Sequence, residues 1–380
     1  MSTVAPTTPY YLETLEQVIK DVIAPNAPEV DRNGTFPQAG IDALGKAGLL
    51  GLISAKKVGG LGEGHRAATL VVEQIGKYCS STAMIVCMHY SATAVIEAYG
   101  PKDVREAIAA GKHLSTLAFS EYGSRSQFWA PMSTATIDGD KIRLDAKKSW
   151  ITAAGHAQSY VWSSRPVEAE GMSSIWLVPS NAPGLKVTAP FDGLGLRGNA
   201  SSPVSADGVL VSKDALLGED GKGFDIMMGV VLPYFQLMNA ALSVGIMETA
   251  TSKAAAHVST TKFEHLGQTL ADSPVTRASI ARMQLKTDMV RMLLLDTISA
   301  LESGREDAML RVLEIKAAAG EAATEVTDLA MRVCGGSAFR KEVGVERIFR
   351  DARASTVMAP TADALYDFIG KAVCGMPLFA

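Results

Sequence analysis

The chain has 380 residues, of which 47 % are apolar and 20 % charged, and its formal net charge is −4. This composition is typical of a globular protein with one large or several smaller domains rather than of a disordered chain. The absence of a Lys/Arg-rich arm argues against nucleic acid as a partner. Four scattered cysteines without a Cys-x-x-Cys pair fit a reducing cytoplasm and give no support to a metal site.

The first part of the chain predicts a helical domain over residues 1–112. Apolar residues recur at helical spacing up to Tyr78 and again over 81–99. The second of these helices ends at Gly100-Pro101, which is a strong stop signal. The N-terminal residues lack the basic and apolar regions of a secretory signal, which again favours the cytoplasm.

Residues 113–218 predict a β-domain. Asp138-Gly139 separates two β-type runs, 134–137 and 141–144, in the pattern of a hairpin. Further short strands are expected at 159–163, 174–178, 185–189 and 209–211. Short strands with Gly, Pro, Asn and Asp turns indicate a small antiparallel barrel or sandwich.

Residues 219–380 predict a helical bundle, so the fold class is α+β in the order helices, strands, helices. Apolar residues recur by threes and fours over 280–301 and 309–333, and these runs end at Gly304 and at Gly335-Gly336. The uncharged stretch 226–247 is long enough to span a membrane. Its proline and two amides favour a helix buried in the bundle, so no membrane is expected.

Four segments interrupt these patterns and could hold a ligand. The loop 118–126 offers hydroxyls and backbone N–H groups to an anion, although a plain Ser/Gly loop explains it as well. Trp150 could be a core residue or a flat wall for an aromatic cofactor, with Thr152 as a hydrogen-bond donor. The loop 194–201 reads alone as irregular, and Gly335-Gly336 either caps a helix or admits a ligand.

The order and spacing of these segments resemble the acyl-CoA dehydrogenase family over nearly the whole chain. That resemblance implies an N-terminal helical domain, a middle antiparallel β-domain and a C-terminal four-helix bundle, with FAD between the last two and usually a homotetramer. The matching residues are Ser120-Glu121 with Ser126 for the T-E-P-x-A-G-S loop, 150–152 for W-I-T, 195–201 for M-G-x-R-x-S-x-T, and 334–336 with 350–352 for C-G-G…R-D-A.

The resemblance also implies an FAD site. Ser120 would bond the polar edge of the flavin, Ser126 would contact the pyrophosphate, and Trp150 would cover the isoalloxazine. The glycine pair would admit the adenosine half of an FAD held by the neighbouring subunit, so a dimer or tetramer is part of the site. The implied cofactor residues are Leu117, Phe119, Ser120, Ser126, Trp150, Thr152, Gly335, Gly336 and Thr361.

The chain departs from the family at the catalytic base. The family's usual Glu lies seven residues after the Ala of R-D-A, and that position is Ala359 here. The alternative base position, on the first helix of the bundle, is Phe235. Neither residue supplies a carboxylate, although removal of an α-proton from a thioester needs a positioned base. The R-x-x-F-G motif is also reduced, since Phe263, Leu266 and Gly267 occupy its positions.

Few polar side chains are left as candidates for chemistry. Tyr122 and Arg125 lie within the loop that resembles the flavin loop, and we expect them to contact a ligand. His89 lies among apolar residues of the 81–99 helix, and it could equally be a satisfied core histidine.

We therefore expect a flavin-dependent oxidoreductase that acts on an acyl-CoA thioester with a relocated or absent base, as the acyl-CoA desulfinases of this fold do without the glutamate. The alternative is a two-component flavin-dependent monooxygenase that uses reduced flavin and O₂ on a small aromatic or sulfur compound. Members near the dibenzothiophene monooxygenase also have a proline in the loop that contains Pro360. A third possibility is a non-catalytic flavin- or CoA-binding relative. An electron-transfer protein or a flavin reductase is the expected protein partner.

Overall fold

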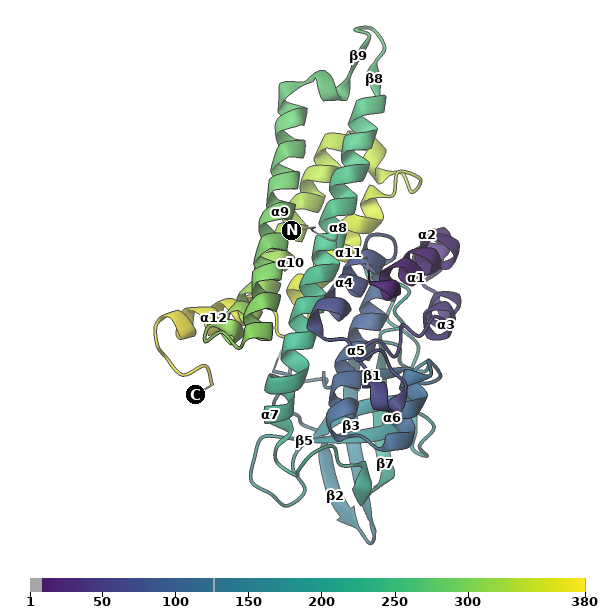
Figure 1. Cartoon of the computed structure of the whole chain (residues 1–380), viewed down its shortest axis with the longest axis vertical. Helices are drawn as coiled ribbons and strands as arrows, with labels where there is room; N and C mark the ends of the chain where they lie inside the picture. The colour runs from purple at the N-terminus through teal and green to yellow at the C-terminus, as the bar shows by residue number, and fades with distance from the viewer. Residues whose placement is uncertain (1–8, 126, 380) are drawn as a thin grey trace, which may run out of the picture.

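The N-terminal region is a layer of helices packed around one buried helix, α5 (Figure 1). The computed structural model describes residues 9–125 and 127–379. α5 is buried along nearly its whole length and ends before Gly100-Pro101, as predicted. The helices of this layer are α1 (Tyr10–Val18), α2 (Ala24–Asn33), α3 (Gln38–Lys46), α4 (His65–Gly76), α5 (Ser80–Tyr99) and α6 (Lys102–Ala109).

The middle region contains two small sheets. One has the order β1-β4-β5, and the other has the order β2-β3-β7-β6. The predicted hairpin is confirmed, with Gly139 in the left-handed region at φ 62° and Ile137 opposite Ile142. The strands are β1 (Ser115–Ala118), β2 (Thr134–Asp138), β3 (Lys141–Ile151), β4 (Ser159–Ser164), β5 (Ser174–Pro179), β6 (Leu185–Val187) and β7 (Ser202–Ser212).

One strand pair differs from the antiparallel arrangement expected for this region. β1 and β4 pair in parallel, with Ser115 opposite Ser159. After β1 the chain passes through β2 and β3 of the other sheet before it reaches β4, so β4 can start at the same end as β1. Parallel neighbouring strands need a long connection of this kind.

The C-terminal region is a bundle of long helices, as predicted. A π-helical turn at Met227–Val231 joins α7 to α8, and Gly304 ends α9 at φ 65°. A short hairpin, β8 (Lys262–Phe263) with β9 (Gln268–Thr269), closes the far end of the bundle (Figure 1). The helices are α7 (Gly223–Ile226), α8 (Leu232–Thr260), α9 (Pro274–Ser303), α10 (Ala308–Cys334), α11 (Val345–Val357) and α12 (Ala362–Val373).

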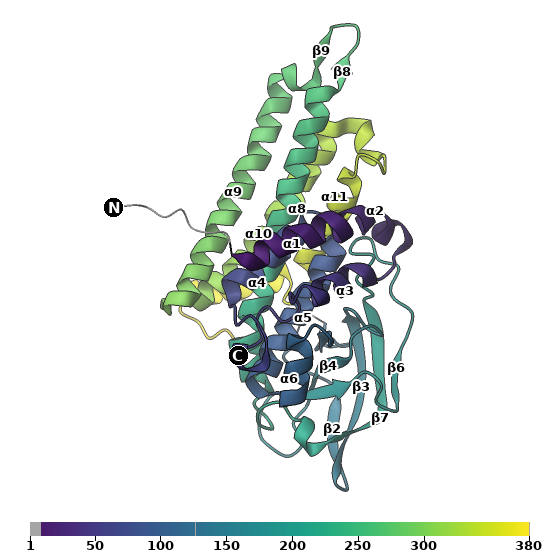
Figure 2. The ribbon, with the colours of Figure 1, turned by 45° about the vertical axis from the view of Figure 1, so that its right-hand side comes forward.

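The three regions meet around α5 and α8. α5 packs against α4, α8 and β1, and α8 packs against α4, α9, α10 and α11. Figure 2 shows α1–α3 lying across the side of the bundle near its junction with the sheets. The run Gly223–Thr260 is long and apolar enough to span a membrane, but 89 % of its most apolar window is buried within the structure. This agrees with the prediction of a helix buried in the bundle.

Candidate functional site

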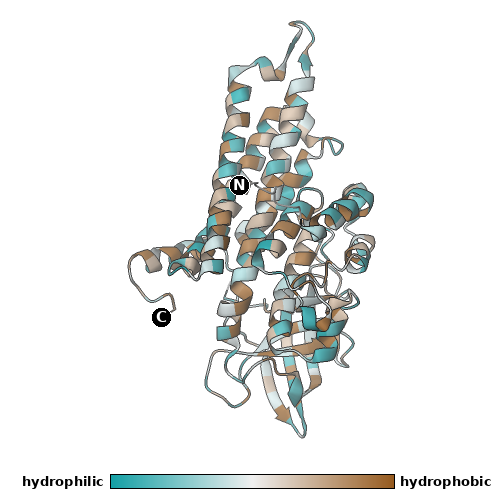
Figure 3. Cartoon of the chain, viewed as in Figure 1, coloured by the Kyte–Doolittle hydropathy of each residue, from teal (hydrophilic) through white to brown (hydrophobic). Residues whose placement is uncertain are grey.

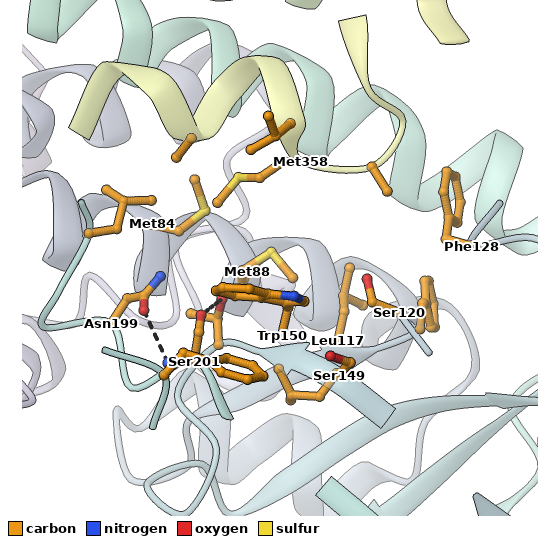
Figure 4. Close-up of a pocket in the computed structure, with 18 of the residues that line it drawn as sticks. Met84, Met88, Leu117, Ser120, Phe128, Ser149, Trp150, Asn199, Ser201 and Met358 are labelled. Atoms are coloured by element: carbon orange, nitrogen blue, oxygen red, sulfur yellow. Dashed lines mark hydrogen bonds between the residues drawn. The ribbon is translucent and has the colours of Figure 1, made fainter. Parts of the chain in front are cut away.

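A cavity of about 800 Å³ lies where the three regions meet. Its walls come from α5, the loop after β1, the end of β3, the 191–201 loop, the start of α8 and the α11–α12 connection. Figure 4 shows Met358 on one side of the cavity and Trp150 on the other. Sequence-predicted residues gathered here are Leu117, Phe119, Ser120, Tyr122, Arg125, Trp150, Thr152 and Thr361, together with the two base positions Phe235 and Ala359.

Trp150 forms a flat aromatic surface in this cavity. Its side chain stacks on Phe191, with ring centroids 4.1 Å apart and an angle of 29° between the rings. The residue remains 59 % exposed, although it lies at the end of a long strand. A large apolar ring left open inside a cavity is the kind of surface on which a planar ligand can stack.

The backbone around the cavity is strained. Within residues 9–125 and 127–379, the non-glycine residues with φ near +50° to +60° are Arg125, Trp150, Ala153, Leu196 and Ala200. Three of these line the cavity, and the other two are next to lining residues. Left-handed backbone is unfavourable for side chains with a Cβ atom, and such strain gathers at functional sites. The strain therefore marks this cavity as the functional site independently of any motif.

A buried ion pair holds the 119–132 loop that forms one wall. Lys148 Nζ donates to Glu121 Oε1 at 2.6 Å, and their side chains are 0 % and 2 % exposed. Burial lowers the pKa of Lys148 to about 8, against the opposing effect of Glu121. Glu121 also accepts hydrogen bonds from the backbone N–H groups of Met132 and Ser133, at 2.6 and 3.0 Å. Despite its burial, these partners lower the pKa of the Glu121 carboxyl.

The 194–201 loop is fastened to the C-terminal region. Asp351 accepts a hydrogen bond from the backbone N–H of Leu196 at 2.7 Å. Burial raises the pKa of Asp351 to about 6. A Cβ atom at Gly195 would lie 2.5 Å from the carbonyl oxygen of Arg350, so only glycine permits this close approach. The aspartate of the R-D-A motif thus supports a wall of the cavity rather than lining it.

His89 has a structural role, which corrects its proposal as a catalytic candidate. It is 0 % exposed and does not line the cavity. One ring nitrogen, Nδ1, accepts from the N–H of Ser115 at 3.1 Å, so Nε2 carries the proton that is donated to Leu50 O at 3.0 Å. Burial lowers its pKa to about 4. With both nitrogens satisfied by backbone, this is a neutral core histidine.

The other sequence-predicted residues lie at the rim of the cavity, away from the cavity or outside the described residues. Tyr122 is 82 % exposed at the cavity rim, and Arg125 also lines the cavity. Gly335 and Gly336 follow α10, away from this cavity, and a Cβ atom at either would meet nothing within 4 Å. Ser126 lies outside the described residues.

Sequence reasoning missed several apolar residues of the site. Met84 and Met88 of α5 line the cavity with Phe128 (Figure 4), and Phe191 is a further lining residue. Their spacing on α5, one helical turn apart, was visible in the sequence. It does not distinguish a cavity wall from the core, because both are apolar at helical period.

The cavity contains few groups that could move a proton. Among the described residues that line it, the ionisable ones are Glu121, Tyr122, Arg125 and Arg197. Glu121 is the sole carboxylate of this set, and Lys148 already neutralises it. Nor does the described part of the chain contain a group of three or more His, Cys, Asp or Glu residues that could hold a metal ion.

Comparison with known proteins agrees with this architecture. Models of the acyl-CoA dehydrogenase N-terminal, middle and C-terminal domains match residues 10–111, 116–209 and 221–374. The chain is 28 % identical over 363 residues to a probable acyl-CoA dehydrogenase, YngJ, of Bacillus subtilis, covering 92 % of this chain and 93 % of the relative. It is 29 % identical over 360 residues to the human mitochondrial short-chain specific acyl-CoA dehydrogenase, covering 93 % and 86 %.

A solved structure of glutaryl-coenzyme A dehydrogenase with glutaryl-CoA has a TM-score of 0.91 and 25 % identity, covering 100 % of this chain and 98 % of that one. The three domain models follow one another in family order and together span nearly the whole chain. Members of this family are FAD-dependent oxidoreductases. The chain belongs to the acyl-CoA dehydrogenase family and is a flavin-dependent oxidoreductase with FAD as its cofactor.

Proposed function

We propose that the protein oxidises an acyl-CoA thioester with FAD, and that no carboxylate at either family position serves as its base. The relatives named above act on acyl-CoA compounds, which supports the substrate class. The observation that carries the proposal is the position of Phe235 and Ala359. Both line the same cavity, so the two places from which a base would act are present and apolar.

The residues on the β side of this cavity fit a flavin. Trp150 on Phe191 offers a flat surface, and the hydroxyls of Ser120 and Thr152 border it as hydrogen-bonding groups. When bound, FAD supplies the hydride acceptor. Leu117 and Phe119 add apolar contact on this side, and Thr361 adds a hydroxyl from the other. Contacts from Ser126, and from Gly335-Gly336 toward the FAD of a neighbouring subunit, remain part of the proposal.

The opposite side of the cavity suits an apolar acyl group. Met84 and Met88 of α5 and Phe235 of α8 give it a surface with little capacity for hydrogen bonding. Long unbranched thioethers adapt to irregular ligand shapes. These apolar side chains would exclude water from the acyl group, and Tyr122 at the exposed rim has a hydroxyl that can exchange a proton with solvent.

An anaerobic titration of the FAD-loaded protein with straight-chain, branched and dicarboxylic acyl-CoAs tests the proposal. We expect acyl-CoA to bleach the visible absorbance of the oxidised flavin, slowly because no placed carboxylate takes the α-proton. Ala359→Glu should raise the bleaching rate about 10²-fold, the lower end of what general base catalysis contributes. Ala359→Gln is the matched control and should leave the rate low. Flavin that stays oxidised with every acyl-CoA and in both variants would contradict the proposal.

A second candidate function rests on the same observation, that Phe235 and Ala359 supply no carboxylate. A two-component flavin-dependent monooxygenase needs no base at positions 235 and 359, and it would take a small aromatic or sulfur compound in place of the thioester. Chemically reduced FAD, O₂ and the protein should then give an oxygenated product that is absent without protein. The two functions also need different partners, an electron-transfer protein for the first and a flavin reductase for the second.

We also propose that the chain assembles as a homo-oligomer, either a dimer or a homotetramer. Figure 3 shows apolar positions recurring among polar ones along α9. Leu285, Met289 and Met292 lie on one face of this helix at helical spacing and are 62 %, 69 % and 63 % exposed. A large exposed apolar stripe is characteristic of an interaction surface. Mass measurement in solution tests this, and a monomer at micromolar concentration would contradict it.

A further inference from the structure

One lysine of the bundle contacts the cavity-lining α11–α12 connection from behind. Lys316 lies in α10 and is 1 % exposed. Its Nζ donates to three backbone carbonyl oxygens of one short stretch, those of Ser355 at 3.0 Å, Met358 at 3.0 Å and Pro360 at 2.7 Å. Within the described part of the chain, no carboxylate forms an ion pair with this lysine, and burial lowers its pKa to about 7.

The number of N–H donors on the Lys316 ammonium group equals the number of carbonyl acceptors around it. An ammonium group has three N–H donors, and three carbonyl oxygens surround this one. α11 ends at Val357, and the last carbonyl groups of a helix have no partner within it. Pro360 has no N–H, so the connection offers one donor fewer to these carbonyl groups. Lys316 therefore supplies hydrogen bonds that the backbone of this connection cannot make for itself.

Burial of this charge is favourable for only one position of the loop. Removing an ammonium from water costs several kcal/mol, and only well-placed hydrogen bonds offset that cost. All three acceptors belong to the 355–360 segment, so a displaced loop would leave the charge buried and unsatisfied. The lysine thus penalises other loop conformations in addition to stabilising this one.

The same segment forms the cavity wall on its other side. The side chains of Met358, Ala359 and Thr361 line the cavity, whereas the carbonyl groups of Met358 and Pro360 are held by Lys316. One turn further along α10, a Cβ atom at Gly320 would lie 3.1 Å from Ser355 Oγ. α10 and the end of α11 are therefore packed closely, and a change on α10 is transmitted to the wall.

We propose that Lys316 is a positioning residue that fixes the wall at Met358–Thr361 through its backbone, and thereby sets how tightly the cavity holds flavin and acyl group. This inference rests on the proposed function of the cavity. Asn239 of α8 also contacts the segment, accepting from Ser355 Oγ and lying 3.5 Å from Met358 Sδ. Asn239 therefore contacts the segment through side chains, whereas Lys316 donates hydrogen bonds to its backbone carbonyl groups.

The test compares Lys316→Met with the FAD-loaded wild type by hydrogen exchange and by flavin loss during gel filtration. The amides of Met358, Ala359 and Thr361 should exchange about tenfold faster, the effect of losing roughly one net hydrogen bond to a charged group. Flavin loss should rise with it, and Lys316→Arg should restore part of both. Lys286→Met is the matched control, because it removes an ion pair between α9 and Glu325 of α10 without touching the segment.

Two outcomes separate this inference from the proposed function. If the wild type retains no FAD, the proposed function fails, whereas the exchange measurement still reports on the loop. If loop exchange and flavin loss in Lys316→Met equal those of the wild type and only the unfolding midpoint falls, Lys316 merely stabilises the bundle and the inference is overturned. Should Lys316→Met fail to fold, Gly320→Ala displaces the end of α11 without removing a charge and must speed the same exchange.

Discussion

The two loops that face each other across the cavity are each held by a buried lysine, but in different ways. On the β side, Lys148 is paired with the carboxylate of Glu121 at 2.6 Å. Lys148 also donates to the carbonyl oxygen of Ser163 at 2.7 Å and to the hydroxyls of Ser133 and Ser163. On the bundle side, the partners of Lys316 among residues 9–125 and 127–379 are backbone carbonyl oxygens. The β side therefore depends on a buried pair of opposite charges, whereas the bundle side depends on one charge surrounded by backbone carbonyl groups.

Strain distinguishes the two sides as well. All the non-glycine residues with left-handed backbone in the described chain lie between 125 and 200, on the β side. The β wall is therefore rigid and specific, as a surface that orients a planar cofactor must be. The bundle wall can change its side chains without changing its backbone. This explains how alanine can stand at position 359 while the connection still closes the cavity.

The largest expected effect is on the β side. Lys148→Met should lower the free energy of unfolding by about 3–5 kcal/mol, because it leaves the Glu121 carboxylate buried without its partner. Urea denaturation measures the loss. The double variant Lys148→Met with Glu121→Gln removes both charges and should recover more than half of it. An equal loss in the single and double variants would show that the charge itself is not what costs stability.

A pH titration that compares the wild type with Lys316→Met isolates the contribution of Lys316, because the pKa of Lys148 is lowered too and its contribution is common to both proteins. Burial lowers the pKa of Lys316 from the usual 10.5 to about 7, so between these values the unfolded chain binds a proton that the folded chain does not. The sign follows from that difference, because stability rises with pH wherever the unfolded state binds more protons. We expect the wild type to gain about 2 kcal/mol relative to Lys316→Met between pH 7 and about pH 9.

The same deprotonation should act oppositely on the loop. A neutral amine donates two hydrogen bonds rather than three, so flavin loss should increase over the pH range in which global stability rises. Lys316→Arg, which stays charged, should lack the part of both trends that comes from position 316, and only the contribution of Lys148 to stability should remain. A wild type whose stability and flavin retention rise together with pH would contradict the assignment.

The part of the structure that could be predicted from the sequence differs between the fold and the site. Helical period identified α5, α9 and α10, and Asp138-Gly139 identified the β2–β3 hairpin, because these signals are local. The parallel pairing of β1 with β4 was missed because it joins segments some forty residues apart, and no local pattern encodes it.

The site was predicted where loops break the periodic pattern and missed where apolar helices line it. Trp150 and Ser120 were assigned to the site through the resemblance of their segments to family motifs, whereas Met84 has the same pattern as a core residue. Lys316 was also missed, since one lysine in an amphipathic helix normally indicates a solvated position. Only the fold shows that it is buried against three carbonyl groups.

The smallest expected effect concerns the strain on the β side. Ala153 has φ 55° and is 1 % exposed, whereas Ala146 of β3 is 9 % exposed and has no left-handed backbone, although it borders a shift of register in the β3–β7 pairing. Replacing either by glycine removes one methyl group and adds conformational entropy to the unfolded chain, which together cost about 1 kcal/mol or more. Only at position 153 does glycine also relieve left-handed strain, so Ala153→Gly should be about 1 kcal/mol less destabilising than Ala146→Gly.

Relieving that strain should also weaken the site. Ala153 donates its backbone N–H to Asn199 O at 2.8 Å, which ties the end of β3 to the 194–201 loop. A glycine there permits more backbone conformations, so the Trp150 surface should be less fixed and the flavin released faster than from Ala146→Gly. The measurement is flavin release after dilution, set beside the unfolding free energy of each variant. Ala153→Gly could instead equal Ala146→Gly in both unfolding free energy and flavin retention. The strained backbone would then have no function, and the two sides of the cavity would differ only in their buried charges.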